Sequence, residues 1–136
     1  MNQFRNIDRP SAPQTVSIEF IRAQAPDEYP DLSFLEQSYS DVENDAEREN
    51  MQKADEARLA AYNRGDWYMR GLFVEARISV PIGGGSFALY TLRSPGLWGV
   101  ESDCGASYEN EVWQEEEHAL RAALKEMGAA FAKLPD

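Results

Sequence analysis

The chain has 136 residues, 43% of them hydrophobic, with 24 acidic and 13 basic side chains and a formal net charge of −11 at pH 7. This length is sufficient for one domain that folds without a metal, and the single cysteine excludes an internal disulfide. No apolar run approaches the ~20 residues of a membrane-spanning helix, and the N-terminal residues lack the apolar core of a secretory signal. We therefore expect a cytoplasmic protein.

The negative charge is concentrated in two blocks of the sequence. Residues 27–56 contain eleven acidic residues, with Arg48 and Lys53 as their only basic neighbours, and residues 101–117 contain seven acidic residues without any lysine or arginine. Nucleic acids and anionic membranes repel such surfaces, so we do not expect either as a direct partner. We expect a basic protein surface as the partner. The alternative is that the acidic residues only keep the protein soluble.

The first predicted element is a β-strand at residues 15–23, where apolar and polar residues alternate. Residues 1–14 contain two prolines and few apolar groups, so we expect a flexible N-terminal arm. Residues 15–136 are expected to form a single α+β domain. Two further prolines end the strand, and Asp31 is then a suitable N-cap for a short helix.

An acidic helix is predicted over residues 41–63, because Glu, Ala, Arg, Gln, Lys and Met dominate there and Gly65 supplies a stop. The first half of this helix has almost no apolar face. Its carboxylates also repel one another at the i, i+4 spacing, as Glu43 and Glu47 do. A helix that is polar all round is typical of a solvent-bridging or partner-binding segment.

Three β-strands and a helix are predicted to follow. The strands cover residues 67–80, 86–93 and 97–101, and the glycines at 83–85 supply the first turn between them. An amphipathic helix that ends near Gly128 follows the strands. The pattern predicts an α+β fold: an antiparallel three- to four-stranded meander packed against a C-terminal helix, with an acidic helical segment before the sheet.

No motif in the sequence indicates catalysis. The only histidine, His118, lacks the second Glu-x-x-His motif of a di-iron site, and the cysteine has acidic neighbours that disfavour a thiolate. The acidic run that starts at Asp41 differs from a calcium loop, because Ala46 replaces the glycine and Gln52 replaces the bidentate glutamate. A weak divalent-cation site in this run is left as an alternative interpretation. We predict no enzyme activity, no catalytic residue, no bound metal and no cofactor.

The candidate partner-binding residues are therefore acidic and aromatic. Trp67 and Tyr68 follow the helix stop and, if exposed, would act as interface anchors. The acids of residues 101–117 are a second choice. The preferred acidic residues are Asp27, Glu28, Asp31, Asp41, Glu43, Asp45, Glu47 and Glu49.

Three segments resemble parts of small proteins that phages and integrative elements of bacteria carry. They are GLWGVESD at residues 96–103, PDLSFLEQSY at residues 30–39 and RLAAYNRGDW at residues 58–67, and the resemblance covers roughly residues 27–128. It implies a setting in the host bacterial cytoplasm and a class of proteins that includes anti-CRISPR and anti-restriction inhibitors. Such inhibitors are typically small, acidic and non-enzymatic.

The leading hypothesis is a non-enzymatic inhibitor of a bacterial defence complex. Its clustered carboxylates would bind a basic nucleic-acid-binding surface of a protein or ribonucleoprotein and block access of DNA. The alternative is a structural or regulatory protein of the mobile element that acts by homo-oligomerisation, for example as a homodimer, through an apolar sheet face or the pair Trp67 and Tyr68.

Overall fold

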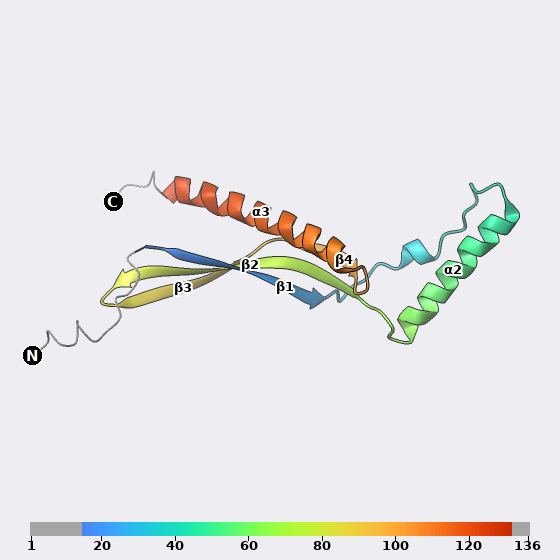
Figure 1. The fold of residues 1–136 in the computed structure, drawn as a ribbon, viewed down its shortest axis with the longest axis horizontal. Coiled ribbons are helices and arrows are strands. Elements are labelled where there is room, and N and C mark those ends of the chain that lie inside the picture. Colours follow the sequence, from blue (N-terminus) through green and yellow to red (C-terminus); the bar gives the residue numbers. More distant parts are fainter. Residues whose placement is uncertain (1–14, 132–136) are drawn as a thin grey trace, which may run out of the picture. The chain divides into compact units, whose positions relative to one another are not determined.

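The computed structural model describes residues 15–131, and their side chains as far as residue 128 (Figure 1). The α+β class, the antiparallel sheet, the helix before its main hairpin and the C-terminal helix are all confirmed. The predicted N-terminal arm at 1–14 lies outside the described residues. The elements in chain order are β1 (Ser17–Pro26), the 3₁₀ turn η1 (Ser33–Leu35), α2 (Asp45–Asn63), β2 (Met69–Gly83), β3 (Ser86–Arg93), β4 (Leu97–Glu101) and α3 (Ala106–Phe131).

The long strand β2 organises the sheet, in which the strand order is β1-β2-β3 and β4 also pairs with β2. Strand β3 pairs antiparallel with the second part of β2, from Glu75 opposite Arg93 onward. Strand β4 pairs antiparallel with the first part of β2, where Met69 lies opposite Glu101. The predicted third strand therefore exists, but it returns to β2 and does not extend the meander beyond β3.

Ser94 explains why the chain stays beside β2 between β3 and β4. Its backbone N–H donates to the carbonyl oxygen of Val74 at 2.9 Å, and its side-chain oxygen accepts from the Val74 N–H at 2.9 Å. Ser94 is buried, so these bonds keep both backbone groups of Val74 satisfied where the strand is interrupted. The segment between β3 and β4 is thus an irregularity in an arm that continues along β2.

By their contacts the described residues form two compact units. The first unit contains the chain up to Ala23, Phe73–Gly96 and the chain from Val112 onward, and the second contains Gln24–Leu72 and Leu97–Glu111.

The first unit is a sheet covered by α3 (Figure 1). Val74 and Ala76 of β2 are fully buried and pack with Leu120 of α3, and Trp113 packs against this cluster. The indole N–H of Trp113 also donates to the carbonyl oxygen of Ala23 at 3.0 Å. The middle of the predicted apolar stripe, with Trp113, Leu120 and Leu124, is therefore the part that packs on the sheet.

The second unit has a core cluster made by Leu35, Trp67 and Met69. The rings of Tyr62 and Trp67 meet edge to face, with centroids 5.1 Å apart. No residue of α2 is fully buried, as its thin apolar stripe predicts. The helix begins at Asp45 and not at residue 41, because the side chain of Asn44 accepts a hydrogen bond from the Glu47 N–H and caps it.

Candidate partner-binding surface

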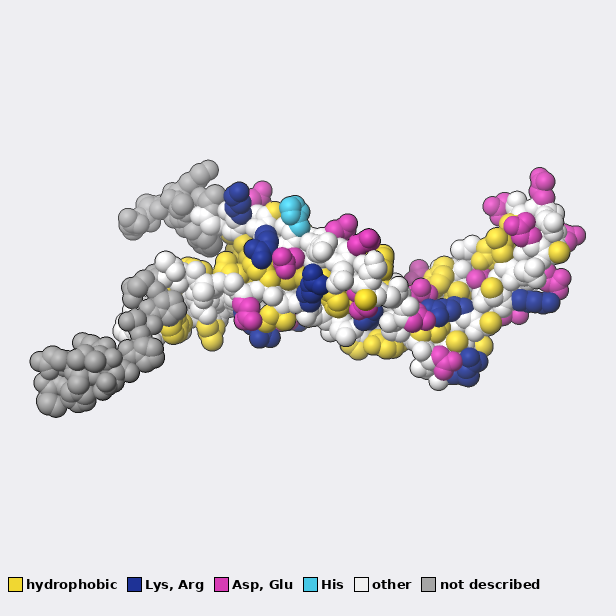
Figure 2. All heavy atoms as spheres, viewed as in Figure 1, with side chains coloured by type: hydrophobic (Ala, Val, Ile, Leu, Met, Phe, Trp, Pro, Cys, Tyr) yellow, Lys and Arg dark blue, Asp and Glu magenta, His cyan; other side chains and the backbone are white. Residues whose placement is uncertain are grey.

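The beginning of α2 and the loop before it carry five exposed carboxylates. We call this group the acidic head, and the exposed side chains that form it are Asp41, Glu43, Asp45, Glu47 and Glu49. In Figure 2 acidic side chains gather at this end of α2. The prediction that all of them share one helix is wrong for Asp41 and Glu43, which lie in the loop. The helix supplies only the other three.

Side chains of α2 hold this loop in place. Arg48 donates from Nε to the carbonyl oxygen of Tyr39 at 3.2 Å and from its terminal nitrogen to the carbonyl oxygen of Val42. One turn further along α2, Gln52 donates to the carbonyl oxygen of Ser38 at 2.9 Å. These bonds satisfy loop carbonyls that no regular structure pairs, so the acidic head has a folded scaffold.

The Tyr39 hydroxyl, which donates to the carboxylate of Asp55, is a second link between the loop and α2. This hydrogen bond raises the pKa of Tyr39 above its ordinary value of 10.0. Tyr39 has a φ angle of 54°, a left-handed conformation that non-glycine residues seldom adopt. The hydrogen bond that its carbonyl accepts and the one that its hydroxyl donates therefore stabilise an unfavourable backbone conformation at the turn before α2.

The acidic head keeps most of its negative charge. Arg48 lies 3.0 Å from Asp45, and Lys53 lies 3.4 Å from Glu49. These two cations are also the only basic residues of the block at 27–56. Both acidic partners are largely exposed, at 92% and 66% of their side chains, so these pairs are weak and readily exchanged.

The earlier acidic candidates, Asp27, Glu28 and Asp31, lie elsewhere. They follow directly on β1, whereas the acidic head lies at the other end of the second unit, at the start of α2 (Figure 1). Asp31 accepts from the Ser33 N–H at 3.0 Å, and hydrogen bonds from Ser33 lower the pKa of Asp31. The predicted set of eight acidic residues is therefore divided between two places.

Four of the seven carboxylates in the second acidic block pair with arginines from outside it. Arg58 of α2 bridges Asp103 and Glu101, at 2.7 and 3.2 Å. Arg70, which is buried, lies 3.1 Å from Glu109. Glu117 in turn pairs with Arg121 at 3.1 Å. The charges of Glu101, Asp103 and Glu109 are therefore used within the fold, which disfavours these residues as a second binding surface. The pair of Glu117 is an exposed i,i+4 pair like that of Glu49, and it is equally weak.

Arg58 is the most connected of these arginines. Its two terminal nitrogens donate to the two carboxylate oxygens of Asp103, both at 2.7 Å, and its guanidinium carbon lies 3.7 Å from the centroid of the Trp67 ring. The pair raises the pKa of Arg58 and lowers the pKa of Asp103 from 3.8. Arg58 therefore joins α2 to the turn after β4 through both charge and aromatic contact.

Trp67 is not an exposed anchor, so that prediction is wrong. It is only 2% exposed and its indole N–H donates to the carbonyl oxygen of Arg58 at 3.0 Å. Burial of so large an aromatic side chain contributes roughly 2–3 kcal/mol, which explains why the ring folds back onto α2. The neighbouring Tyr68 is 51% exposed and stays a candidate contact residue.

Within residues 15–131, no group of three or more His, Cys, Asp or Glu side chains is arranged to hold a metal ion. The helices that the structure describes include none with the length and apolar character needed to cross a membrane. Cys104 is a half-buried free thiol.

Comparisons with models of protein families, with curated proteins and with solved structures find no match to this chain. Its surface is therefore interpreted from its own geometry and charge.

Proposed function

We propose that this protein is a non-enzymatic inhibitor of a bacterial defence complex, and that the acidic head binds a basic nucleic-acid-binding surface of that complex. The observation that carries the proposal is the acidic head itself: five exposed carboxylates on a loop and helix start that hydrogen bonds hold in shape. A scaffold of this kind reduces the conformational entropy lost on binding. The resemblance to phage-borne proteins supplies the class of partner.

The spacing of the carboxylates suits a surface that normally binds phosphates. Asp45 and Glu49 are four residues apart on α2, which places their backbone positions about 6 Å apart along the axis. One DNA strand presents a phosphate about every 3.4 Å of axis, so alternate phosphates are separated by a similar distance. Lysine and arginine side chains placed for a phosphate backbone can therefore meet carboxylates of the head.

Long-range electrostatics favour the same partner. A net charge of −11 attracts a cationic cleft and speeds encounter with it, and this attraction weakens as salt shortens the Debye length to about 8 Å at physiological ionic strength. Binding through exposed carboxylates is therefore expected to weaken steeply with salt.

A plaquing assay with charge-reversed variants tests the proposal. The wild-type chain is produced in strains that carry a CRISPR–Cas or restriction system, and the plaquing of a targeted phage is counted. Where the wild type restores plaquing, the triple variant Glu43→Lys, Glu47→Lys, Glu49→Lys is expected to lose the effect. A matched triple variant at exposed acids outside the head, Glu111→Lys, Glu115→Lys, Glu126→Lys, is expected to keep it. Equal inhibition by both triple variants would refute binding through the head.

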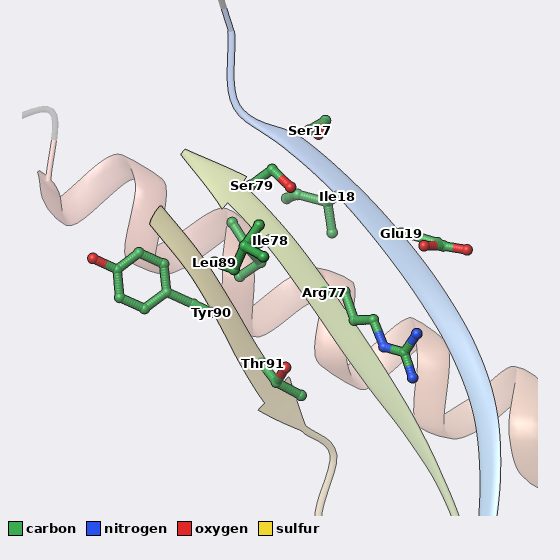
Figure 3. Close-up of a pocket in the computed structure, with 9 residues that line it drawn as sticks. All are labelled: Ser17, Ile18, Glu19, Arg77, Ile78, Ser79, Leu89, Tyr90 and Thr91. Atoms are coloured by element: carbon green, nitrogen blue, oxygen red, sulfur yellow. The ribbon is translucent and has the colours of Figure 1, made fainter. Parts of the chain in front are cut away.

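A second candidate function is homo-oligomerisation through the sheet of the first unit, and exposed apolar side chains favour it. Ile82, Leu89 and Tyr90 near the β2–β3 turn are 64%, 76% and 57% exposed. Figure 3 shows Leu89 and Tyr90 among nine residues of β1, β2 and β3 that line a shallow cavity of about 330 Å³. Leu89 and Tyr90 are adjacent in β3 and so lie on opposite faces of the sheet. Light scattering at 1 M NaCl distinguishes the candidates: a dimer that persists there and is lost in Leu89→Ser supports oligomerisation through the face that carries Leu89, because apolar contacts survive salt.

A further inference from the structure

A groove beside the end of β1 combines exposed aromatic rings with carboxylates. It has a volume of about 420 Å³ and lies in the second unit, and it is lined by Ala25, Pro26, Asp27, Glu28, Tyr29 and Trp98. Tyr29 is 89% exposed and Trp98 46% exposed, which is high for aromatic side chains of this size. The groove is distinct from the acidic head, since none of these residues belongs to the head.

Asp27 fixes the shape of the groove. One of its carboxylate oxygens accepts from the Tyr29 N–H at 3.1 Å, and the other accepts from the Gly99 N–H at 3.1 Å. Its own N–H donates to the carbonyl oxygen of Met69 at 3.0 Å. These bonds join the segment that carries Tyr29 to the strand that carries Trp98, although 72 residues separate Asp27 from Gly99 in the chain.

Gly71 fixes the indole of Trp98. A β-carbon at position 71 would lie 2.3 Å from a carbon of that indole, a distance that two carbon atoms cannot share. The ring therefore lies directly against the backbone of β2, and only glycine at position 71 permits this. An aromatic ring held flat on a strand while nearly half exposed offers a preformed contact surface at low entropic cost.

The chemistry of the groove suits a cation. The face of an indole or phenol ring attracts ammonium and guanidinium groups, and nearby carboxylates add to the attraction. The same unit already uses this combination once, because Arg58 lies over Trp67 and bonds to Asp103 and Glu101. None of the six described residues that line the groove is basic, so Asp27 and Glu28 bring negative charge there without a cation among the lining residues.

We propose that the groove formed by Tyr29, Trp98, Asp27 and Glu28 binds an arginine side chain of a partner polypeptide. The flat guanidinium stacks on the aromatic rings and faces the Glu28 carboxylate, while Asp27 holds the two sides of the groove together. The site does not depend on the function proposed for the acidic head.

Nuclear magnetic resonance titration of the full ¹⁵N-labelled chain tests this site. The probe is acetyl-Gly-Arg-Gly-amide, and the control probe has citrulline in place of arginine, which keeps the shape and removes the charge. Saturable shifts are expected at the Trp98 indole N–H and at the amides of Glu28, Tyr29 and Gly99, with a Kd on the order of millimolar. Equal shifts with the citrulline probe, or no shifts at these residues, would overturn the proposal.

Variants separate this site from general attraction to an acidic protein. Tyr29→Ala is expected to raise the Kd about two- to fivefold. The Tyr29 side chain is highly exposed, so we expect this variant to fold normally and the weaker binding to come from loss of the ring. Glu28→Gln is expected to weaken binding while Glu56→Gln, at an exposed acid of the same unit, leaves it unchanged. The triple head variant is expected to retain the groove shifts. Shifts confined to residues 41–49 would overturn the groove and leave the acidic head as the binding surface.

Discussion

Replacement of Arg58 by alanine is predicted to destabilise the second unit by about 2 kcal/mol, the sum of the two contributions that follow. The guanidinium stacks on the buried ring of Trp67 and bonds to Asp103 and Glu101. The stacked contact contributes about 1 kcal/mol, because the arginine side chain is 31% exposed and so lies between the exposed and desolvated cases.

The ion pairs contribute about 1 kcal/mol more. Asp103 and Glu101 are 51% and 36% exposed at their side chains, so water solvates both carboxylates once the arginine is gone. Arg58→Lys keeps the charge and the aliphatic stem but loses the planar fork, and we expect it to cost about half as much.

Urea unfolding followed by tryptophan fluorescence and circular dichroism measures these differences. Arg64→Ala is the control, since Arg64 is 64% exposed and pairs with Asp66 on the surface, and we expect a change within about 0.5 kcal/mol. A double-mutant cycle of Arg58→Ala with Asp103→Ala isolates the pair. If Arg58→Ala costs no more than Arg64→Ala, the argument that Arg58 joins α2 to the turn after β4 is refuted.

Four further changes test the packing and the titrating groups. Gly71→Ala is expected to displace the Trp98 indole and destabilise the chain by about 1–3 kcal/mol, visible as a red shift of fluorescence; an unshifted spectrum would contradict it. Gly128→Ala in α3, with nothing within 4 Å, is expected to stabilise by up to about 1 kcal/mol in urea unfolding. The lowered pKa of Asp103 gives stability that is present above its unfolded pKa and lost as pH falls through its folded pKa. Asp103→Asn is therefore expected to reduce the fall in the free energy of unfolding below about pH 4. The raised pKa of Tyr39 has the opposite sign: stability is lost as pH rises past 10.0, and Tyr39→Phe removes that loss.

Local patterns in the sequence predicted most of the fold. The alternation in β1 and β2, the helical composition that ends at Gly65 and the apolar stripe of the C-terminal helix correspond to observed elements. Each of these signals lies within one segment of the chain. The predicted helix end near Gly128 is wrong, because α3 continues through this residue to Phe131. The start of α2 was predicted four residues too early. The acidic composition begins at Asp41, before Asn44, whereas the helix is capped at Asn44.

Contacts between distant segments account for what the sequence did not predict. The partners Arg58 and Asp103 are 45 residues apart, so their pairing was invisible in a charge count. Trp67 follows a helix stop, which suggested exposure, but the ring folds back onto α2 and is buried. The acidic head was predicted from its composition, whereas the loop bonds of Arg48 and Gln52 that shape it were not.

The groove at Trp98 was also missed. Trp67 and Tyr68 were singled out from the sequence as candidate aromatic contacts, whereas Trp98, which is 46% exposed, was not. A usable signal was present in the glycine at position 71 inside a predicted strand, since such a glycine often marks the close approach of another group.

The salt dependence of partner binding tests the central claim most directly. Once a defence complex that the chain inhibits has been purified, the Kd is measured from 50 to 500 mM NaCl for the wild type and for the Glu43, Glu47, Glu49 charge-reversal variant. We predict that wild-type binding weakens steeply with salt, and that the variant binds at least tenfold more weakly at low salt with a flatter dependence. Equal affinity and equal salt dependence for the two proteins would contradict the claim that the exposed carboxylates of the acidic head make the contact.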